Sequence, residues 1–275
     1  MNPSSLSAPC DYHIHTRNTD DAQDTLDAMA QAAAARGIAE IAVTDHFVPG
    51  LRGFCITPAQ VEQHFRDAEA IKRRHGVTVR VGIEADYLPG SVRELETMLA
   101  AFDFDMVLGA AHFVDGCGLA DEGSARTFFS RHEPHTAYRL YFEHLTESIQ
   151  SGLFDVMAHL DLVRKFGAAM AGNPRFETYA DHAQAAARAL AQTGTGFEVN
   201  CRGFDHSCGE QYPSAPFLDM IRQAGACIVT LGSDAHQAGA VGDYLDRGAA
   251  ALRAAGFTQC HTFARRRAAV RPLPG

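Results

Sequence analysis

The amino-acid sequence predicts an α/β fold in which seven parallel strands form a barrel-like sheet. Three observations predict it: seven short apolar segments rich in β-branched residues, a helical pattern after each segment, and a metal-competent side chain where six of the segments end. Parallel neighbours need a crossover connection, which is usually a helix, so this alternation favours a parallel sheet. Barrels of this kind carry their chemistry at the carboxyl ends of the strands. We therefore expect one domain over residues 1–275, with its site at that end.

The expected strands and helices alternate along almost the whole chain. The strands are expected at residues 11–15, 41–46, 79–84, 106–112, 154–159, 196–200 and 227–236. The helices are expected at residues 25–36, 58–75, 91–101, 126–151, 176–193, 215–224 and 241–255. Gly37 and Gly76 directly follow the first two helical patterns, and glycine is common just past the end of a helix.

Composition excludes several classes of protein. The net charge is −9 and no basic stripe is present, which argues against a groove for a nucleic acid polymer. No segment approaches the roughly 20 apolar residues that span a membrane, and residues 1–10 do not resemble a secretory signal. Seven cysteines without a C-x-x-C pair indicate reduced thiols in a cytoplasmic protein. The basic run at residues 265–267 is interpreted as a solvated end, and the oligomeric state is not predicted.

The polar residues at the strand ends are imidazoles and carboxylates. They are His13, His15, Asp45, His46, Glu84, His112, His159, Asp234 and His236. An H-x-H pair alone is a weak signal, because two strand residues two apart merely face the same way. Six strand ends that meet at one barrel mouth are a stronger signal, and their mixture of ligands suits Zn, Fe or Mn. No cysteine ends a strand, which argues against a structural zinc site.

Histidines within the expected helices are interpreted differently. Four of them, His64, His75, His144 and His182, are expected to be ordinary surface or core residues, because they follow no strand end.

The sequence resembles the PHP (polymerase and histidinol phosphatase) superfamily, and within it the histidinol-phosphatase branch. The resemblance extends from residue 11 to about residue 263. The motifs that carry it are DYHIHT, AVTDH, GIEADY, GAAHFVDG, FDVMAHLDLVRKF, FEVN with a following EQYPS, and LGSDAH. The resemblance implies a distorted seven-stranded (β/α)7 barrel of the PHP type, which agrees with the strands counted above.

The resemblance also implies two or three divalent metal ions and their ligands. The first ion is expected to be held by His13, His15, Glu84 and Asp234. Glu84 is expected to bridge to a second ion held by His112 and His159. A third site is expected to use His46, His236 and a carboxylate in the loop after His15, where family spacing favours Asp21 over Asp20.

Such a site suits the hydrolysis of a small phosphate monoester. Three divalent cations carry six positive charges against three carboxylates, so positive charge remains for a phosphate dianion and a metal-bound hydroxide. Glu84 and Asp234 are thus expected to serve catalysis as well. The branch implies L-histidinol phosphate as the substrate, in histidine biosynthesis. The alternative is a phosphatase or diesterase for another small ester, such as a nucleotide or sugar phosphate.

Two rivals fit the residues less well. An amidohydrolase-type centre commonly bridges its metals with a lysine at a strand end, and no lysine ends a strand here. A catalytically silent module would be expected to have lost ligands, and every expected ligand is present.

The substrate-binding residues are less clearly indicated. Arg164 and Arg202 are expected to clamp the phosphate, and His206 is a candidate general acid for the leaving alkoxide. The chain departs from its branch at Asp205, close to where histidinol phosphatases usually carry an arginine. Asp205 or Glu210 is expected to meet the ammonium group of the substrate.

Overall fold

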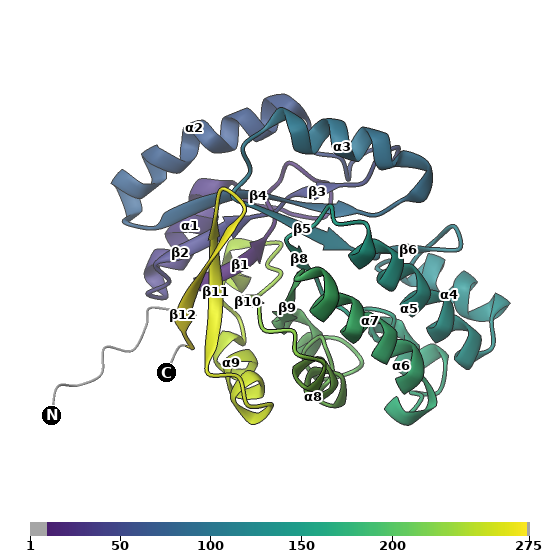
Figure 1. The fold of residues 1–275 in the computed structure, drawn as a ribbon. Coiled ribbons are helices and arrows are strands. Elements are labelled where there is room, and N and C mark those ends of the chain that lie inside the picture. Colours follow the sequence, from purple (N-terminus) through teal and green to yellow (C-terminus); the bar gives the residue numbers. More distant parts are fainter. Residues whose placement is uncertain (1–9, 274–275) are drawn as a thin grey trace, which may run out of the picture.

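The computed structural model describes residues 10–273, which include a nearly closed barrel of parallel strands (Figure 1). The barrel strands are β1 (Cys10–Ile14), β2 (Glu40–Val43), β4 (Thr78–Asp86), β5 (Met106–Ala110), β8 (Val156–Met157), β9 (Gly196–Asn200) and β10 (Val229–Gly232). They pair in chain order, all in parallel, and the short β3 (His46–Phe47) pairs with β4. The N–H of His15 donates to the carbonyl of Ala235 at 2.9 Å, which brings β1 beside the segment after β10. The predicted distorted seven-stranded barrel is confirmed.

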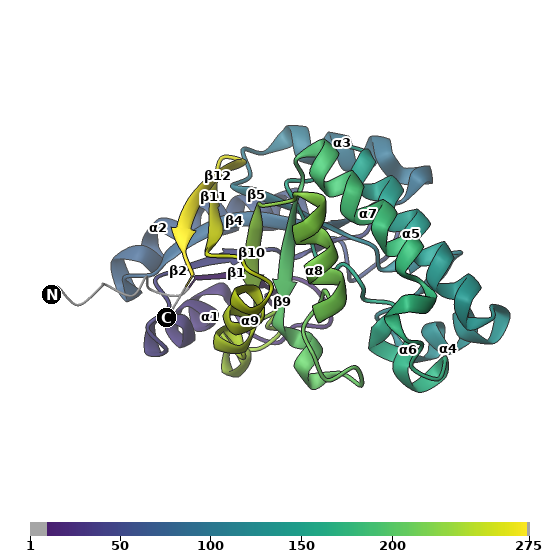
Figure 2. The same cartoon turned by 60° about the horizontal axis from the view of Figure 1, so that its bottom comes forward.

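The helices lie round the outside of the sheet (Figures 1 and 2). They are α1 (Leu26–Ala35), α2 (Pro58–His75), α3 (Val92–Ala101), α4 (Glu122–Arg131), α5 (Pro134–Gln150), α6 (Arg164–Met170), α7 (Ala180–Thr193), α8 (Ala215–Ala224) and α9 (Leu245–Ala254). Four 3-10 turns join them: η1 (Pro89–Ser91), η2 (Phe176–Thr178), η3 (Cys201–Asp205) and η4 (Ala238–Ala240). Among the described residues, no helix is both long and apolar enough to cross a membrane.

Local sequence signals explain where the clearest helix begins and ends. Helix α2 follows Thr57, whose side chain accepts the N–H of Gln60, while the Gln60 side chain accepts the N–H of Thr57. This capping box satisfies two N–H groups that the first helical turn leaves unpaired. The helix ends at Gly76, whose φ of 73° suits glycine at a helix terminus.

The helix expected at residues 126–151 is instead two helices. Helix α4 ends at Arg131, and α5 begins at Pro134. Proline lacks the N–H that would continue the hydrogen-bond ladder, and its ring clashes with the preceding turn, so one continuous helix is disfavoured. The structure also contains elements that the sequence patterns did not predict: α6, the hairpin of β6 (Phe113–Val114) and β7 (Cys117–Gly118), and the hairpin of β11 (Gln259–Ala264) and β12 (Arg267–Pro272).

Alternate residues along the strands face two different cores. Ile41 and Val43 of β2 belong to the large core between sheet and helices, whereas Ala42 belongs to a small second cluster. Met106 and Leu108 of β5 belong to this small cluster too, which lies inside the barrel because the strand period is two. The barrel interior is therefore filled with side chains, as in other barrels of parallel strands.

The C-terminal hairpin lies on the opposite side of the molecule from β6, α4 and α6 (Figure 1). The N–H of Phe263 donates to the hydroxyl of Tyr12 at 2.9 Å, and the Phe263 side chain joins the cluster inside the barrel. The Arg266 guanidinium donates to Asp155 at 2.9 Å and to the carbonyl of Leu153 at 2.8 Å. Residues 265–267 are exposed, as predicted, although the hairpin folds back onto the barrel through the contacts of Arg266.

Candidate metal centre

Glu84 lies at the centre of the predicted ligands. Its carboxylate is 1% exposed and comes from the carboxyl-terminal half of β4. One oxygen, Oε1, lies 3.0 Å from Nε2 of His159 and 3.8 Å from Nε2 of His112. The other oxygen, Oε2, lies 3.4 Å from Nε2 of His13 and 3.5 Å from Nε2 of His15. Oε2 also lies 2.9 Å from Nδ1 of His46, so the carboxylate has two histidines at one oxygen and three at the other, as a bridging ligand would.

His13 and His15 share a second carboxylate. Oδ1 of Asp234 lies 3.4 Å from Nε2 of His15 and 3.6 Å from Nε2 of His13. The backbone of Asp234 has a φ of 55°, and that of His159 has a φ of 23°. Residues other than glycine seldom adopt such conformations, which tend to occur at functional sites.

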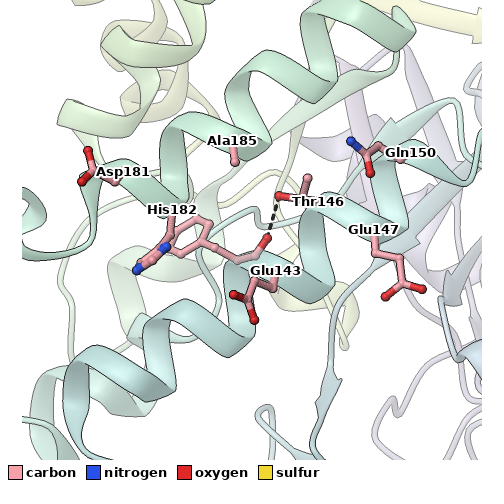
Figure 3. Close-up of a pocket in the computed structure, with 8 residues that line it drawn as sticks. Glu143, Thr146, Glu147, Gln150, Asp181, His182 and Ala185 are labelled. Atoms are coloured by element: carbon pink, nitrogen blue, oxygen red, sulfur yellow. Dashed lines mark hydrogen bonds between the residues drawn. The ribbon is translucent and has the colours of Figure 1, made fainter.

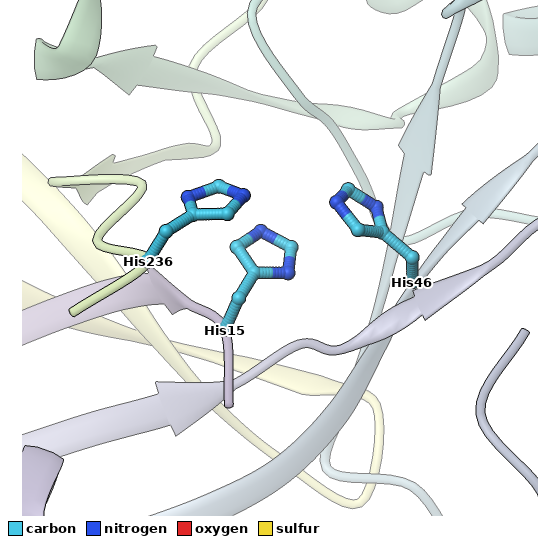
Figure 4. A group of neighbouring side chains, drawn as sticks. All are labelled: His15, His46 and His236. Atoms are coloured by element: carbon cyan, nitrogen blue, oxygen red, sulfur yellow. The ribbon is translucent and has the colours of Figure 1, made fainter. Parts of the chain in front are cut away.

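A third group forms round Asp21. Its Oδ2 lies 3.1 Å from Nε2 of His46 and 3.1 Å from Nε2 of His236. Figure 4 shows His15 between these two histidines, and its ring is stacked on both, with centroids 4.2 and 4.3 Å apart. Asp20 packs against Gly53 instead. Of the two loop carboxylates, the geometry favours Asp21.

Divalent cations fit these groups. Three overlapping sets have all their ligand atoms within 4.8 Å of one another: His15, His46 and His236; His13, His15 and Glu84; and His46, Glu84 and His112. Nδ1 of His15 and Nδ1 of His159 are buried without a hydrogen-bond partner among the described residues, and Nδ1 of His46 faces Oε2 of Glu84 at 2.9 Å without a well-formed hydrogen bond. Buried polar atoms are normally paired, so a cation at this cluster would satisfy atoms that the protein leaves without partners.

Electrostatics keep the carboxylates ionised. Burial alone would raise the pKa of Glu84, but the surrounding histidines, His13 first, hold it well below its usual range. The pKa of Asp234 is likewise well below its usual range for the same reason. Burial, together with neighbouring His46 and His236, lowers the pKa of His15 to about 3. Metal ions bind carboxylates and neutral imidazoles, so the ionised carboxylates and His15 already suit ligands. Burial would lower the pKa values of His13, His46 and His112, but the neighbouring carboxylates raise them above the usual value, so these three imidazoles would release a proton on binding a cation.

Three further carboxylates support the proposed ligands, two by contacting ligand histidines and one through the loop after His15, and the sequence patterns did not predict this role for them. Glu198 accepts Nδ1 of His13 at 2.8 Å and the N–H of His159 at 3.1 Å. Asp86 lies 2.9 Å from Nδ1 of His112. Such partners fix the ring orientation of metal ligands.

The third carboxylate, Asp45, lies 2.7 Å from Nε2 of His64 and accepts the Thr16 hydroxyl at 2.7 Å. His64 was predicted to be an ordinary surface or core residue, and it is buried. Asp45 thus supports the loop that follows His15. A carboxylate inside an otherwise apolar strand, such as Glu198, was the available sequence signal for this kind of residue.

Arg164 was predicted to clamp the phosphate, but its guanidinium group is already paired with carboxylates of the chain. Its side chain is buried and contacts two carboxylates, Asp161 at 3.5 Å and Glu210. Burial would lower the pKa of Arg164, but these two carboxylates raise it above its usual value. Glu210 contacts Arg164 and accepts the N–H of Ala215. Its carboxylate is therefore not free to bind the ammonium group of the substrate, as had been predicted for Asp205 or Glu210.

Two cationic side chains, Lys165 and Arg202, and the neighbouring imidazole of His206 form what we term the cationic rim. Burial lowers the pKa of Lys165, while the carboxylates of Asp234 and Asp21 act to raise it, so its ammonium group lies within electrostatic range of these proposed ligands. The sequence patterns did not predict Lys165 as a substrate-side residue, although it directly follows Arg164.

His206 is poorly suited to the predicted role of general acid. Burial, and then the positive charge of Lys165, lower its pKa to about 4. Its Nδ1 lies 3.0 Å from the hydroxyl of Tyr212. At neutral pH the imidazole therefore has no proton to spare for a leaving group.

A separate groove of about 330 Å³ lies between α5 and α7 (Figure 3). Its lining includes Glu143, Glu147, Asp181 and His182, and it contains none of the predicted ligands. His182 is thus a half-buried surface residue, as predicted.

Comparison with known proteins places these features in a family. A family model described as the PHP domain matches residues 11–202. A Deinococcus radiodurans protein named "Probable histidinol-phosphatase" is 32% identical, over 86% of this chain and 90% of that protein. A Proteus mirabilis protein named as a probable phosphatase is 27% identical, over 86% of this chain and 82% of its own length.

A crystal structure of histidinol phosphate phosphatase from Lactococcus lactis, complexed with zinc, L-histidinol and phosphate, has a similar fold. Its TM-score is 0.84 at 24% identity, covering 96% of this chain and all of that one. The match of the family model over most of the barrel, with the Deinococcus relative above 30% identity, shows that this chain belongs to the PHP domain family.

Proposed function

We propose that this chain is a metal-dependent phosphatase that hydrolyses L-histidinol phosphate to L-histidinol and phosphate, a step of histidine biosynthesis. The observation that carries the proposal is the position of Glu84 among five histidines, with two near one carboxylate oxygen and three near the other. The Deinococcus relative, which is named as a histidinol-phosphatase, supports the choice of substrate.

The proposed ligands are those expected from the sequence. One ion would use His13, His15, Glu84 and Asp234, a second Glu84, His112 and His159, and a third Asp21, His46 and His236. Zn, Fe and Mn all suit this mixture of imidazole and carboxylate. Divalent cations supply Lewis acidity here: they favour deprotonation of water near neutral pH and neutralise charge on phosphoryl oxygens.

The chain itself positions the ester. Lys165 and Arg202 of the cationic rim would bind the non-bridging phosphoryl oxygens, because both carry donors and positive charge beside the predicted ligands. Arg164 would act indirectly, since its contacts with Asp161 and Glu210 join α6 to the segment before α8. His206, neutral at pH 7, would accept a hydrogen bond from the substrate rather than protonate it.

A second candidate is a phosphatase for another small ester. Asp205, the residue at which the sequence departs from the histidinol-phosphatase branch, pairs with Arg202, and this departure is the observation that favours another ester. The Proteus relative, named only as a phosphatase, is compatible with either substrate.

We further propose that residues 1–275 form a single domain that works in the cytoplasm. The packing of all described barrel strands round one site supports the first statement. An odd number of cysteines without a C-x-x-C pair supports the second.

The test is a comparison of kcat/KM for three esters on the wild-type protein: L-histidinol phosphate, p-nitrophenyl phosphate and a mononucleotide. We expect a preference of at least about tenfold for the first, equal to roughly 1.4 kcal/mol of transition-state binding. A smaller preference would favour the second candidate, and absence of turnover of all three would contradict both.

A further inference from the structure

A chain of hydrogen bonds connects Arg202 to the candidate metal centre. Asn200, the last residue of β9, donates its Nδ2 to Oδ2 of Asp234 at 3.1 Å. Its Oδ1 accepts the backbone N–H of Arg202 at 3.0 Å. Asn200 therefore links the backbone of Arg202 to Asp234, a proposed ligand. This link fixes the point from which the Arg202 side chain extends.

The guanidinium group of Arg202 contacts Asp205, whose carboxylate also accepts a hydrogen bond from Tyr244. The NH1 group of Arg202 donates to Oδ2 of Asp205 at 3.2 Å, and the hydroxyl of Tyr244 donates to Oδ1 of Asp205 at 2.7 Å. Each carboxylate oxygen thus has its own partner. Tyr244 directly precedes α9 and has a φ of 60°, so its backbone is in the left-handed region, which the surrounding structure must enforce.

Aromatic packing joins the same two segments. The guanidinium carbon of Arg247 in α9 lies 3.7 Å from the ring centroid of Phe204 and 5.4 Å from that of Tyr244. The rings of Phe204 and Tyr244 lie 5.6 Å apart. This packing joins η3 to the start of α9 and thereby fixes the position of Asp205 beside Arg202.

The geometry leaves one side of the guanidinium available. Among the described residues, the Arg202 side chain has one hydrogen-bond partner, Asp205, which it contacts through NH1. Guanidinium carries five N–H donors in a planar fork, so Nε and NH2 remain for a second anion. Arginine loses much rotamer freedom when it binds, and a prior contact removes part of that cost.

We propose that Asp205 and Tyr244 are positioning residues, which hold the Arg202 guanidinium in place so that its free donors bind the phosphate. This inference rests on the proposed function only in naming Arg202 as a phosphate contact. Asp205 would then improve phosphate binding through Arg202, although its own charge repels an anion.

The test is a double-mutant cycle read out by binding of inorganic phosphate to metal-loaded protein, measured by calorimetry. We expect Asp205→Ala and Tyr244→Phe each to raise the Kd about 3- to 10-fold, as loss of a hydrogen bond would. Arg202→Ala should raise it more, and Arg202→Ala with Asp205→Ala should equal Arg202→Ala alone. Asp205→Asn, which keeps an acceptor, should recover part of the loss.

The matched control is Asp243→Ala. Asp243 directly precedes Tyr244 and pairs with Arg36 at 2.6 Å, so this variant removes a different arginine–aspartate pair close to Tyr244. We expect it to leave the Kd unchanged, with Tm followed for all variants. Additive effects of Arg202→Ala and Asp205→Ala, or tighter phosphate binding in Asp205→Ala, would overturn the inference. If the cycle holds and L-histidinol phosphate is not hydrolysed, the proposed substrate fails and this inference stands.

Discussion

The candidate metal centre and the cationic rim lie side by side, yet the chain holds them in different ways. His13, His15 and Glu84 come from β1, its end and β4, and are 0–1% exposed. Lys165 and Arg202 come from α6 and η3, a short helix and a 3-10 turn, and are half-buried. Side chains at strand ends must face the barrel mouth, whereas a side chain in a short helix faces whichever way the helix turns.

Arg164 and Lys165 show the consequence most clearly. They are neighbours in one sequence motif, and helical geometry separates their directions by about 100°. Arg164 meets the buried carboxylate of Asp161, while Lys165 donates to the carbonyl of Ala120 at 2.9 Å and lies within electrostatic range of Asp234 and Asp21. Charge and spacing alone could not decide which of the two meets the substrate.

The largest expected effect comes from the centre of the ligand cluster. Replacing Glu84 by Ala removes a carboxylate that lies among five histidines. We expect kcat/KM for L-histidinol phosphate to fall by at least about 1000-fold, because the two cations proposed to share Glu84 would lose a ligand at once. The measurement is steady-state kinetics with metal analysis of the same sample. A Glu84→Ala protein with near-normal turnover would contradict the site as a whole.

A matched pair of variants tests the rim against its neighbour. We expect Lys165→Ala to lower kcat/KM about 10- to 150-fold, the range for a charged hydrogen bond of roughly 1.5–3 kcal/mol. Arg164→Ala should act mainly on stability, because it leaves Asp161 and Glu210 without their cation, at a cost of about 3–5 kcal/mol. Chemical denaturation separates the two effects. If Arg164→Ala kept its stability and lost more activity than Lys165→Ala, Arg164 would be the clamp.

A smaller effect is expected one layer outside the ligands. Glu198→Gln keeps the size of the side chain but removes the charge that faces Nδ1 of His13. We expect metal affinity to fall about 10- to 100-fold, as it does when the partner of a ligand histidine is changed. Chelator competition measures this directly, with Glu177→Gln, an exposed pair with Arg175, as the control. Equal affinities in the two variants would mean that Glu198 serves only the fold.

The sequence patterns predicted the elements whose boundaries are set locally. Helices α2 and α8 and strand β9 have the bounds expected from glycine, proline and β-branched residues. The split between α4 and α5 was missed even though Pro134 marks it, because the apolar pattern continues through the break.

Features that depend on distant contacts could not be predicted in this way. The C-terminal hairpin is held by Tyr12 and Asp155, far away in sequence. The direction of Arg164 depends on Glu210, which belongs to another loop. The proposed ligands, by contrast, could be listed from the sequence because most of them end a strand or directly follow one, and the structure brings these side chains together. The strand-end pattern does not say which basic residues of the cationic rim face the substrate.

The most direct test of the central claim is the metal content of wild-type protein purified without chelator, measured by elemental analysis beside turnover of L-histidinol phosphate. The account predicts at least two equivalents of Zn, Fe or Mn per chain, with activity lost when a chelator removes them and restored when they are returned. Protein that holds less than one equivalent and keeps full turnover would contradict it.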